Sequence, residues 1–89
     1  MIMTAPVETT LIYGTAWCGD CRRTRLFFDK NQIPYQWIDI DRDPAGKQFV
    51  EKVNHGNRSV PTIVFPNGDI LVEPRDSQLV ARFGIQATI

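Results

Sequence analysis

The sequence predicts a single α/β domain with the element order β-α-β-α-β-β-α, in which a four-stranded mixed sheet is flanked by three helices. An aliphatic run that ends at Tyr13 precedes a segment without Gly or Pro, from Asp20 to Ile33, and a second pair of strand and helix follows. Further along, the sequence Pro-Asn-Gly-Asp at 66–69 separates two apolar runs and is typical of a β-hairpin. These observations together predict the fold class.

The first strand and helix lie in the N-terminal third of the chain. Residues Glu8 to Tyr13 are rich in Thr and aliphatic side chains, which indicates a buried strand. Gly14 to Trp17 is predicted to be a connecting loop. The helix is expected to begin near Cys18–Gly19 and to end near Lys30–Asn31, where the Asn provides a left-handed stop.

A second strand and helix follow Pro34, which keeps the residue before it extended. Tyr35 to Ile40 alternates in hydrophobicity and predicts a strand parallel to the first, reached by a right-handed crossover. Asp43 suits an N-cap and Pro44 suits the first helical position. This helix is expected to end at 54–56. Its buried face is predicted from apolar residues spaced by four, with one alongside: Ala45, Phe49, Val53 and Val50.

The C-terminal third predicts an antiparallel hairpin and a final helix. The hairpin strands are expected at Thr62 to Phe65 and at Ile70 to Val72. The last helix covers roughly Ser77 to Phe83, and Gly84 is its expected stop. Its buried side chains are predicted to be Leu79, Val80 and Phe83.

Composition narrows the possible roles. The chain has 89 residues and a formal net charge of zero, so we expect one domain over 1–89, with tails at 1–7 and 84–89. A neutral chain favours no nucleic-acid or membrane partner, and no apolar stretch approaches the roughly 20 residues of a membrane span. The N-terminus does not resemble a signal peptide. We expect a cytoplasmic protein and a monomer.

The motif Cys18-Gly19-Asp20-Cys21 contains both cysteines of the chain and lies where a strand gives way to a helix. In a reducing compartment this spacing favours thiol-disulfide chemistry over a structural disulfide. Free N–H groups and the positive end of the helix dipole favour the thiolate form of Cys18. Cys21 lies on the same helix face and closer to the interior. We therefore expect Cys18 to be the attacking thiol and Cys21 the resolving one.

The charges around this motif leave two interpretations open. Asp20 suits the helix dipole but places negative charge between the two sulfurs. Three arginines follow and could offset that charge: Arg22, Arg23 and Arg25. They fit either a solvated helix face or a surface that attracts anionic substrates to the rim of the cysteine pair.

Aromatic residues and one proline are further candidates. Trp17 adjoins Cys18, so we expect its side chain on the substrate-facing rim, whereas Tyr13 fits the core and the rim equally well. Cis bonds make up only about 5–6% of X–Pro bonds, so Val60–Pro61 alone would be read as trans. Beside a CxxC motif, a cis bond is the better prediction, because it would present the Val60 backbone to a substrate. The remaining aromatics are predicted to be core: Phe27, Phe28, Trp37, Phe49, Phe65 and Phe83.

From about Thr9 to Phe83, the sequence resembles the glutaredoxins, and most of all their mycoredoxin-type branch. The resemblance is carried by the stretch 17–21, Trp-Cys-Gly-Asp-Cys, by 56–62, which contains Val-Pro-Thr, and by the Asn-Gly turn. It implies a thioredoxin fold with a cis Pro61 beside the cysteines. It also implies that the Val60 backbone pairs with a bound low-molecular-weight thiol, and that Cys18 reduces protein disulfides or mixed disulfides.

Three departures bear on which small thiol is used. Gly19-Asp20 replaces the Pro-Tyr of classical glutaredoxins, and Thr15 replaces a lysine that meets a glutathione carboxylate. The segment 73–77 replaces a Gly-Gly and acidic motif. The resemblance therefore implies mycothiol or a similar thiol as co-substrate, with its reductase system, more than glutathione. Thr15 and Trp17 join Val60, Pro61, Arg75 and Asp76 as the predicted substrate-binding residues.

Two other functions fit part of the sequence. A glutaredoxin-type iron-sulfur cluster, bridged between two copies, is the main non-enzymatic alternative, and a redoxin coupled to thioredoxin reductase is another. Two cysteines and His55 fall short of the four ligands of a structural zinc, and His55 fits a helix end better. We therefore expect no bound metal or cofactor.

Overall fold

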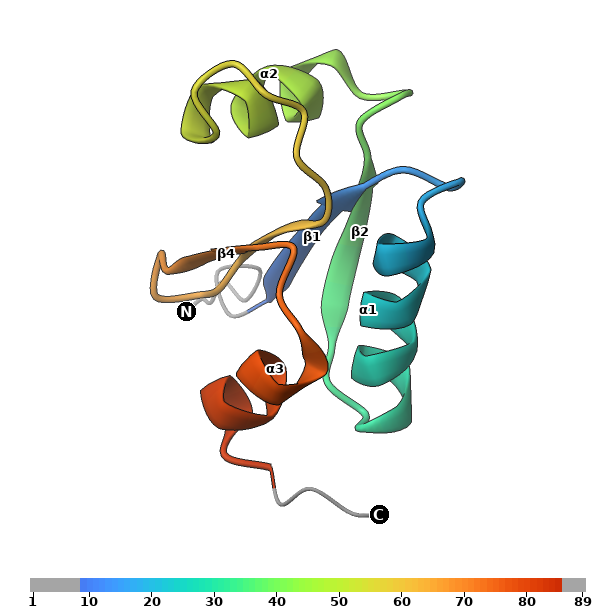
Figure 1. Cartoon of the computed structure of the whole chain (residues 1–89), viewed down its shortest axis with the longest axis vertical. Coiled ribbons are helices and arrows are strands. Elements are labelled where there is room, and N and C mark those ends of the chain that lie inside the picture. Colours follow the sequence, from blue (N-terminus) through green and yellow to red (C-terminus); the bar gives the residue numbers. More distant parts are fainter. Residues whose placement is uncertain (1–8, 86–89) are drawn as a thin grey trace, which may run out of the picture.

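The computed structural model describes residues 9–85 and has the predicted α/β architecture, a four-stranded sheet with three helices (Figure 1). The elements in chain order are β1 (Thr10–Gly14), α1 (Gly19–Lys30), β2 (Tyr35–Asp39), α2 (Pro44–Val53), β3 (Thr62–Val64), β4 (Ile70–Val72) and α3 (Asp76–Phe83). Within residues 9–85, no helix has both the length and the apolar character needed to cross a membrane.

The sheet is mixed, with the strand order β2-β1-β3-β4. β1 pairs with β2 in parallel, and the register places Ile12 opposite Trp37. β1 and β3 are antiparallel, with Ile12 opposite Ile63, and the β3–β4 hairpin places Ile63 opposite Leu71. Both the parallel first pair and the antiparallel last pair were predicted, and the register confirms them.

The two faces of the sheet carry different helices. Ile12 and Ile63 project on one face into a buried cluster with Phe28 of α1 and Leu79 of α3. Because side chains alternate along a strand, Tyr13 projects on the opposite face, where its ring stacks on Phe49 of α2 at 4.8 Å. The helices α1 and α3 therefore cover one face, and α2 covers the other.

Aromatic rings fill the space between α1, α3 and the sheet. Phe28 is fully buried and meets the edges of Tyr35 and Phe83, each with ring centroids 5.4 Å apart. Phe65 is also buried and meets Phe83 at 5.7 Å. The predicted core role of Phe28 and Phe65 is confirmed. Phe27, Trp37 and Phe83 are half-buried and pack against the cluster.

Two boundaries differ from the predictions near the first helix. β1 begins at Thr10 and continues through Gly14, whereas Glu8 lies outside the described residues. Asn31 caps α1 with a φ of −96°, and the left-handed residue is Gln32, with a φ of 58°. The prediction of a left-handed Asn31 is wrong by one position. Its side-chain amide instead donates to the Phe27 carbonyl at 2.9 Å.

The buried face of α2 also differs. Asp43 caps the helix as predicted, since its Oδ1 accepts from the Gly46 N–H at 3.1 Å. Ala45 is exposed, however, and Gly46 and Val50 are the buried residues. The reason is close approach: a Cβ atom on Gly46 would lie 2.9 Å from Ile38 Cγ2. The helix therefore meets the sheet at its glycine and not at its alanine.

The C-terminal hairpin and helix follow the predicted element order, but of the three residues predicted to be buried in α3 only Leu79 is buried, and Val80 and Phe83 are half-buried. Gly68 has a φ of 96° in the hairpin turn, as an Asn-Gly turn requires. α3 begins at Asp76, one residue earlier than predicted, and Gln78 Oε1 accepts from the Arg75 N–H at 2.8 Å. Gly84 ends the helix in the left-handed conformation, with a φ of 64°. His55, with a φ of 58°, lies just past the end of α2.

Candidate active site

Cys18 is the N-cap residue of α1. Its φ and ψ are −84° and 121°, and its Sγ accepts a hydrogen bond from the Cys21 N–H at 3.3 Å. The sulfur thus occupies the position where a Ser or Asp oxygen usually satisfies the free donors of a first helical turn. Cys18 is half-buried, so the sulfur keeps a path to solvent.

Cys21 lies on the same helix in a different environment. Its side chain is 1% exposed, and both cysteines are free thiols. Burial raises the pKa of Cys21 to about 12, although a backbone hydrogen bond from Thr15 opposes the shift. A hydrogen bond with Cys18 also raises this pKa, because the Cys21 thiol acts as its donor. Cys21 therefore stays protonated at neutral pH.

Gly14 determines how closely the sheet approaches Cys21. A Cβ atom at position 14 would lie 2.6 Å from Cys21 Sγ and 2.6 Å from the Trp37 ring. The thiol and the indole therefore occupy the space beside the last residue of β1. We did not predict this role from the sequence, although a glycine four residues before the first cysteine of a CxxC motif was an available signal.

The Val60–Pro61 peptide bond is cis, as predicted. The Val60 carbonyl oxygen lies 4.0 Å from Cys18 Sγ, so this bond borders the cysteine pair. Pro61 is buried, and its carbonyl accepts from the Glu73 N–H at 2.8 Å. Within residues 9–85, the Val60 N–H has no hydrogen-bond partner. An unpaired backbone donor thus lies next to the carbonyl that borders Cys18.

Trp17 lies on the rim beside Cys18, and its side chain is 74% exposed. The indole Nε1–H donates to Asp41 Oδ2 at 2.9 Å, which ties the loop before α1 to the loop after β2. Asp41 was not a predicted site residue, because nothing in the sequence indicates which loop carboxylate faces the indole. The hydrogen bond holds the Trp17 indole against the loop that contains Asp41.

The other predicted substrate-binding residues lie in different environments. Thr15 is only 3% exposed, and its hydroxyl has no hydrogen-bond partner among the described residues. Its backbone, not its hydroxyl, is the part that contacts the cysteine pair. Arg75 and Asp76 are exposed at the start of α3, just past Glu73. The structure thus brings Trp17 and the cis peptide bond to Cys18.

Two of the arginines after the motif have local partners. Arg23 pairs with Asp20 at 3.4 Å on the exposed helix surface, where such a pair contributes little stability. The guanidinium of Arg25 lies over the Trp37 ring, 4.2 Å from its centroid. Arg22 is exposed. These contacts fit the interpretation of a solvated helix face for Arg23 and a packing role for Arg25.

Metal-ligating side chains do not gather elsewhere on the described part of the chain. Within residues 9–85, no three His, Cys, Asp or Glu side chains lie close enough together to hold a metal ion. His55 is exposed at the end of α2.

The family model described as glutaredoxin matches residues 10–71. A Mycobacterium tuberculosis protein assigned to the glutaredoxins is 41% identical over 71 residues, which cover 80% of this chain and 84% of that protein. Mycoredoxin 1 of Corynebacterium glutamicum is 35% identical over 76 residues, covering 85% and 94% of the two chains.

Solved structures agree on the fold. A mutant of the thioredoxin-like protein BC3987 superposes with a TM-score of 0.77 at 20% identity, covering 89% of this chain and 99% of that one. The glutaredoxin of Archaeoglobus fulgidus gives a TM-score of 0.67 at 24% identity, covering 90% and 94%. The predicted thioredoxin fold is therefore confirmed.

Proposed function

Since this chain belongs to the glutaredoxin family, and within it to the mycoredoxin type, we propose that it reduces mixed disulfides with a low-molecular-weight thiol as co-substrate. The family and the fold support thiol-disulfide exchange as its chemistry. The observation that carries the proposal is that the two thiols lie in different environments. One caps a helix and borders solvent, whereas the other is buried with a raised pKa.

The first step is a single thiol-disulfide exchange. The Cys18 thiolate attacks the small-thiol sulfur of a protein mixed disulfide, and the bond between the two substrate sulfurs breaks. The departing protein sulfur keeps the electron pair and takes a proton from solvent. A disulfide between Cys18 and the small thiol remains. The unpaired Val60 N–H and its carbonyl, beside Cys18, are suited to pair with the cysteinyl part of that small thiol.

The second step frees Cys18 by one of two routes. A second small-thiol molecule attacks the small-thiol sulfur of the adduct, releases the Cys18 thiolate and leaves as an oxidised dimer for its reductase. Alternatively, Cys21 loses its proton, attacks Cys18 and expels the small thiol, which forms a disulfide between the two cysteines. Because burial raises the pKa of Cys21 to about 12, the first route is favoured when the small thiol is abundant.

Mycothiol is the small thiol we propose. Position 15 carries a buried Thr and not a cation for a glutathione carboxylate. The turn before α3 contains a buried Pro74 where a Gly-Gly would let a ligand approach the backbone. Arg75 and Asp76, exposed beside this turn, are proposed to contact the polar end of the small thiol, with Trp17 forming the opposite rim. A cytoplasmic location is proposed because its thiols must be kept reduced.

A kinetic comparison tests this function. Oxidised protein is incubated with glutathione, mycothiol or bacillithiol at equal concentration, each with its own reductase, and with thioredoxin reductase alone. We expect mycothiol to give the fastest reduction. Each lost charge-assisted hydrogen bond contributes about 1.5–3 kcal/mol, so glutathione should be slower by one to a few orders of magnitude. Equal rates with glutathione would contradict the choice of thiol, and faster reduction by thioredoxin reductase would contradict the mechanism.

The trapped intermediate identifies the thiol directly. In a Cys21→Ser variant, the adduct on Cys18 cannot be resolved internally, so mass spectrometry of the protein reports which small thiol is attached. Recovery of a glutathione adduct from a mixture of equal parts would contradict the proposal.

A further inference from the structure

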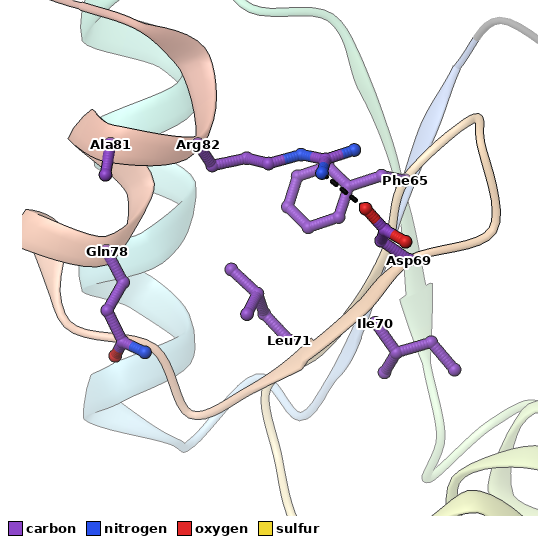
Figure 2. A pocket seen from close by; sticks show the side chains of 7 residues that line it. All are labelled: Phe65, Asp69, Ile70, Leu71, Gln78, Ala81 and Arg82. Carbon is purple, nitrogen blue, oxygen red and sulfur yellow. Dashed lines mark hydrogen bonds and ion pairs between the residues drawn. The ribbon is translucent and has the colours of Figure 1, made fainter.

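A cavity of about 400 Å³ lies between β4 and α3, and neither cysteine is among its lining residues. Figure 2 shows the side chains that border it, with Leu71 directed toward α3 and Ile70 directed to the other side of the strand. The lining residues are Phe65, Asp69, Ile70, Leu71, Gln78, Ala81 and Arg82. Its floor is mostly apolar, and Arg82 is already paired with Asp69 and stacked over Phe65 at 4.2 Å.

The strand beside this cavity is at the edge of the sheet. β4 is the last strand in the order β2-β1-β3-β4, so one side of its backbone has no strand partner within residues 9–85. The hydrogen bonds of the hairpin show which side that is. The Asp69 carbonyl accepts from the Phe65 N–H at 2.9 Å, and the Glu73 N–H donates to the Pro61 carbonyl at 2.8 Å. Positions 69, 71 and 73 therefore face β3.

The residues between them face outward. In an antiparallel pair, backbone groups point alternately toward and away from the partner strand. The N–H and C=O groups of Ile70 and Val72 consequently point away from β3 and are available to an added strand. The side chains of these two residues are each 39% exposed. An edge with apolar side chains and unpaired backbone groups is a template for strand addition.

From this arrangement we propose that β4 docks an extended segment of the client protein as a fifth strand, with one apolar side chain in the cavity. Alternate side chains of an added strand point to opposite faces, so one set reaches the cavity and the other covers Ile70 and Val72. The docked strand also leads to the site, because Glu73 is bonded to Pro61, next to the Val60 carbonyl that borders Cys18. This inference rests on the proposed function for its choice of partner.

Charge distinguishes a client from a second copy of this chain. Antiparallel pairing of two β4 strands about Leu71 would place Asp69 opposite Glu73 at both ends. Like charges directly opposite each other destabilise a strand pair. A client strand with a basic residue beside Glu73 avoids this repulsion. Asp69 is already paired with Arg82, so Glu73 is the carboxylate of this edge without an ion-pair partner within residues 9–85. We therefore specify the partner as a disulfide-bearing protein whose extended segment is apolar at alternate positions and basic at the end that lies beside Glu73.

Amide exchange in the free protein and a peptide titration test the docking surface. In the free protein, the Ile70 and Val72 amides should exchange with solvent much faster than Leu71. The probe is a short synthetic peptide of alternating Val and Thr, with a central Leu and a Lys at each end. In nitrogen-15 spectra it should shift and protect the Ile70 and Val72 amides. The same peptide with Glu ends is the matched control and should bind more weakly.

Variants separate docking from chemistry. Val72→Pro removes an outward N–H and leaves the hydrogen bonds to β3 in place. Ala81→Leu fills the cavity. Gln36→Lys lies on β2, the opposite edge strand, and is the control. Loss of one or two backbone hydrogen bonds should raise KM for a protein mixed disulfide that carries the Lys-flanked segment about five- to tenfold. Turnover of a small mixed disulfide should not change. If the unmodified protein shows no activity on either substrate, the proposed function itself is contradicted.

Several outcomes would overturn the docking proposal while leaving the chemistry intact. One is protection of the Ile70 and Val72 amides in the free protein, which would mean that the chain itself already covers the edge. Another is a concentration-dependent dimer in ultracentrifugation that Val72→Lys abolishes, since that would make a second copy the occupant. A third is peptide binding that shifts amides elsewhere, or an unchanged KM in both Val72→Pro and Ala81→Leu.

Discussion

The backbone N–H of Cys21 donates a hydrogen bond to the sulfur of Cys18 at 3.3 Å, so one cysteine caps the helix on which the other is buried. The same turn of helix therefore leaves one cysteine partly exposed and buries the other. The spacing of a CxxC motif is sufficient to produce this difference, because the cap and the third helical residue lie on one face.

Replacing each cysteine in turn should give unequal effects. Cys18→Ser should abolish exchange with every disulfide substrate, because the attacking sulfur is lost. Cys21→Ser should retain turnover of small-thiol mixed disulfides, since a second small-thiol molecule can resolve the adduct. The measurement is steady-state reduction of a small mixed disulfide with an excess of co-substrate. Comparable losses in both variants would show that turnover requires the dithiol route.

The stability of the reduced protein should fall at high pH because of Cys21. Its folded pKa of about 12 lies above the value of 9.0 for a free thiol, so the unfolded chain loses this proton first. The contribution is fully present below pH 9.0 and is lost progressively as the pH rises toward about 12. Urea unfolding at a series of pH values measures this slope.

Cys21→Ala provides the control for that titration. It removes the buried thiol but leaves Tyr13, whose pKa is raised by burial and by Asp43 and which also titrates in alkaline solution. The difference between the parent and the variant therefore isolates the thiol. Parallel slopes in the two proteins would mean that Cys21 ionises as readily in the folded chain as in the unfolded one.

Gly14→Ala should destabilise the protein and disturb the buried thiol. The new Cβ would lie 2.6 Å from both Cys21 Sγ and the Trp37 ring, so one of them must move. Overpacking of this kind costs about 1–3 kcal/mol of unfolding free energy. Chemical denaturation measures the loss, and alkylation of Cys21 under native conditions should become faster.

Gly19→Ala is the matched control for that substitution. No heavy atom lies within 4 Å of the position its Cβ would take, and residue 19 opens α1, where alanine is favoured over glycine. Stability should stay the same or rise by up to about 1 kcal/mol. If both alanine variants lose stability equally, close packing at Gly14 is not the cause.

Asp41→Ala should release the Trp17 indole. The contact is exposed, so unfolding free energy should change by less than about 1 kcal/mol. The indole N–H resonance should move toward its free position, and KM for a protein disulfide should rise while kcat is retained. Asp41→Asn keeps an acceptor oxygen and should restore both readouts. A KM that is the same in all three proteins would exclude a positioning role for Asp41.

The order of strands and helices could be predicted because each depends on local signals. The turn at 66–69, the Asp43 cap and the Gly84 stop each have one conformation that the residue type favours, and all three appear in the structure. The cysteine spacing likewise predicted that Cys18 lies at the start of α1 and Cys21 closer to the interior, and both positions appear in the structure. The cis bond at Pro61 needed the whole motif, since proline alone predicts a trans bond.

What could not be predicted depends on contacts between elements distant in sequence. Ala45 fits the apolar period of its helix, but Gly46 faces the sheet because Ile38 leaves no room for a Cβ there. Asp41 meets Trp17 across two loops, and no residue pattern indicates that pairing. Burial of Thr15 also follows from packing and not from its type. The contacts and burial of these residues depend on how closely distant segments approach each other in the fold, and those distances cannot be read from a single sequence.

Cys21 and Trp37 both lie beside Gly14, so tryptophan fluorescence can report the redox state of the cysteine pair. Sulfur in contact with an indole quenches its fluorescence, and the quenching changes when a thiol becomes a disulfide. A Cβ atom at position 14 would lie 2.6 Å from both Cys21 Sγ and the Trp37 ring, so the thiol and the indole are near neighbours and Trp37 emission should follow the redox state. Trp17 is 74% exposed and contributes a background that Trp17→Phe would remove. Equilibration of that variant in thiol-disulfide buffers would then yield the midpoint potential of the cysteine pair from unlabelled protein.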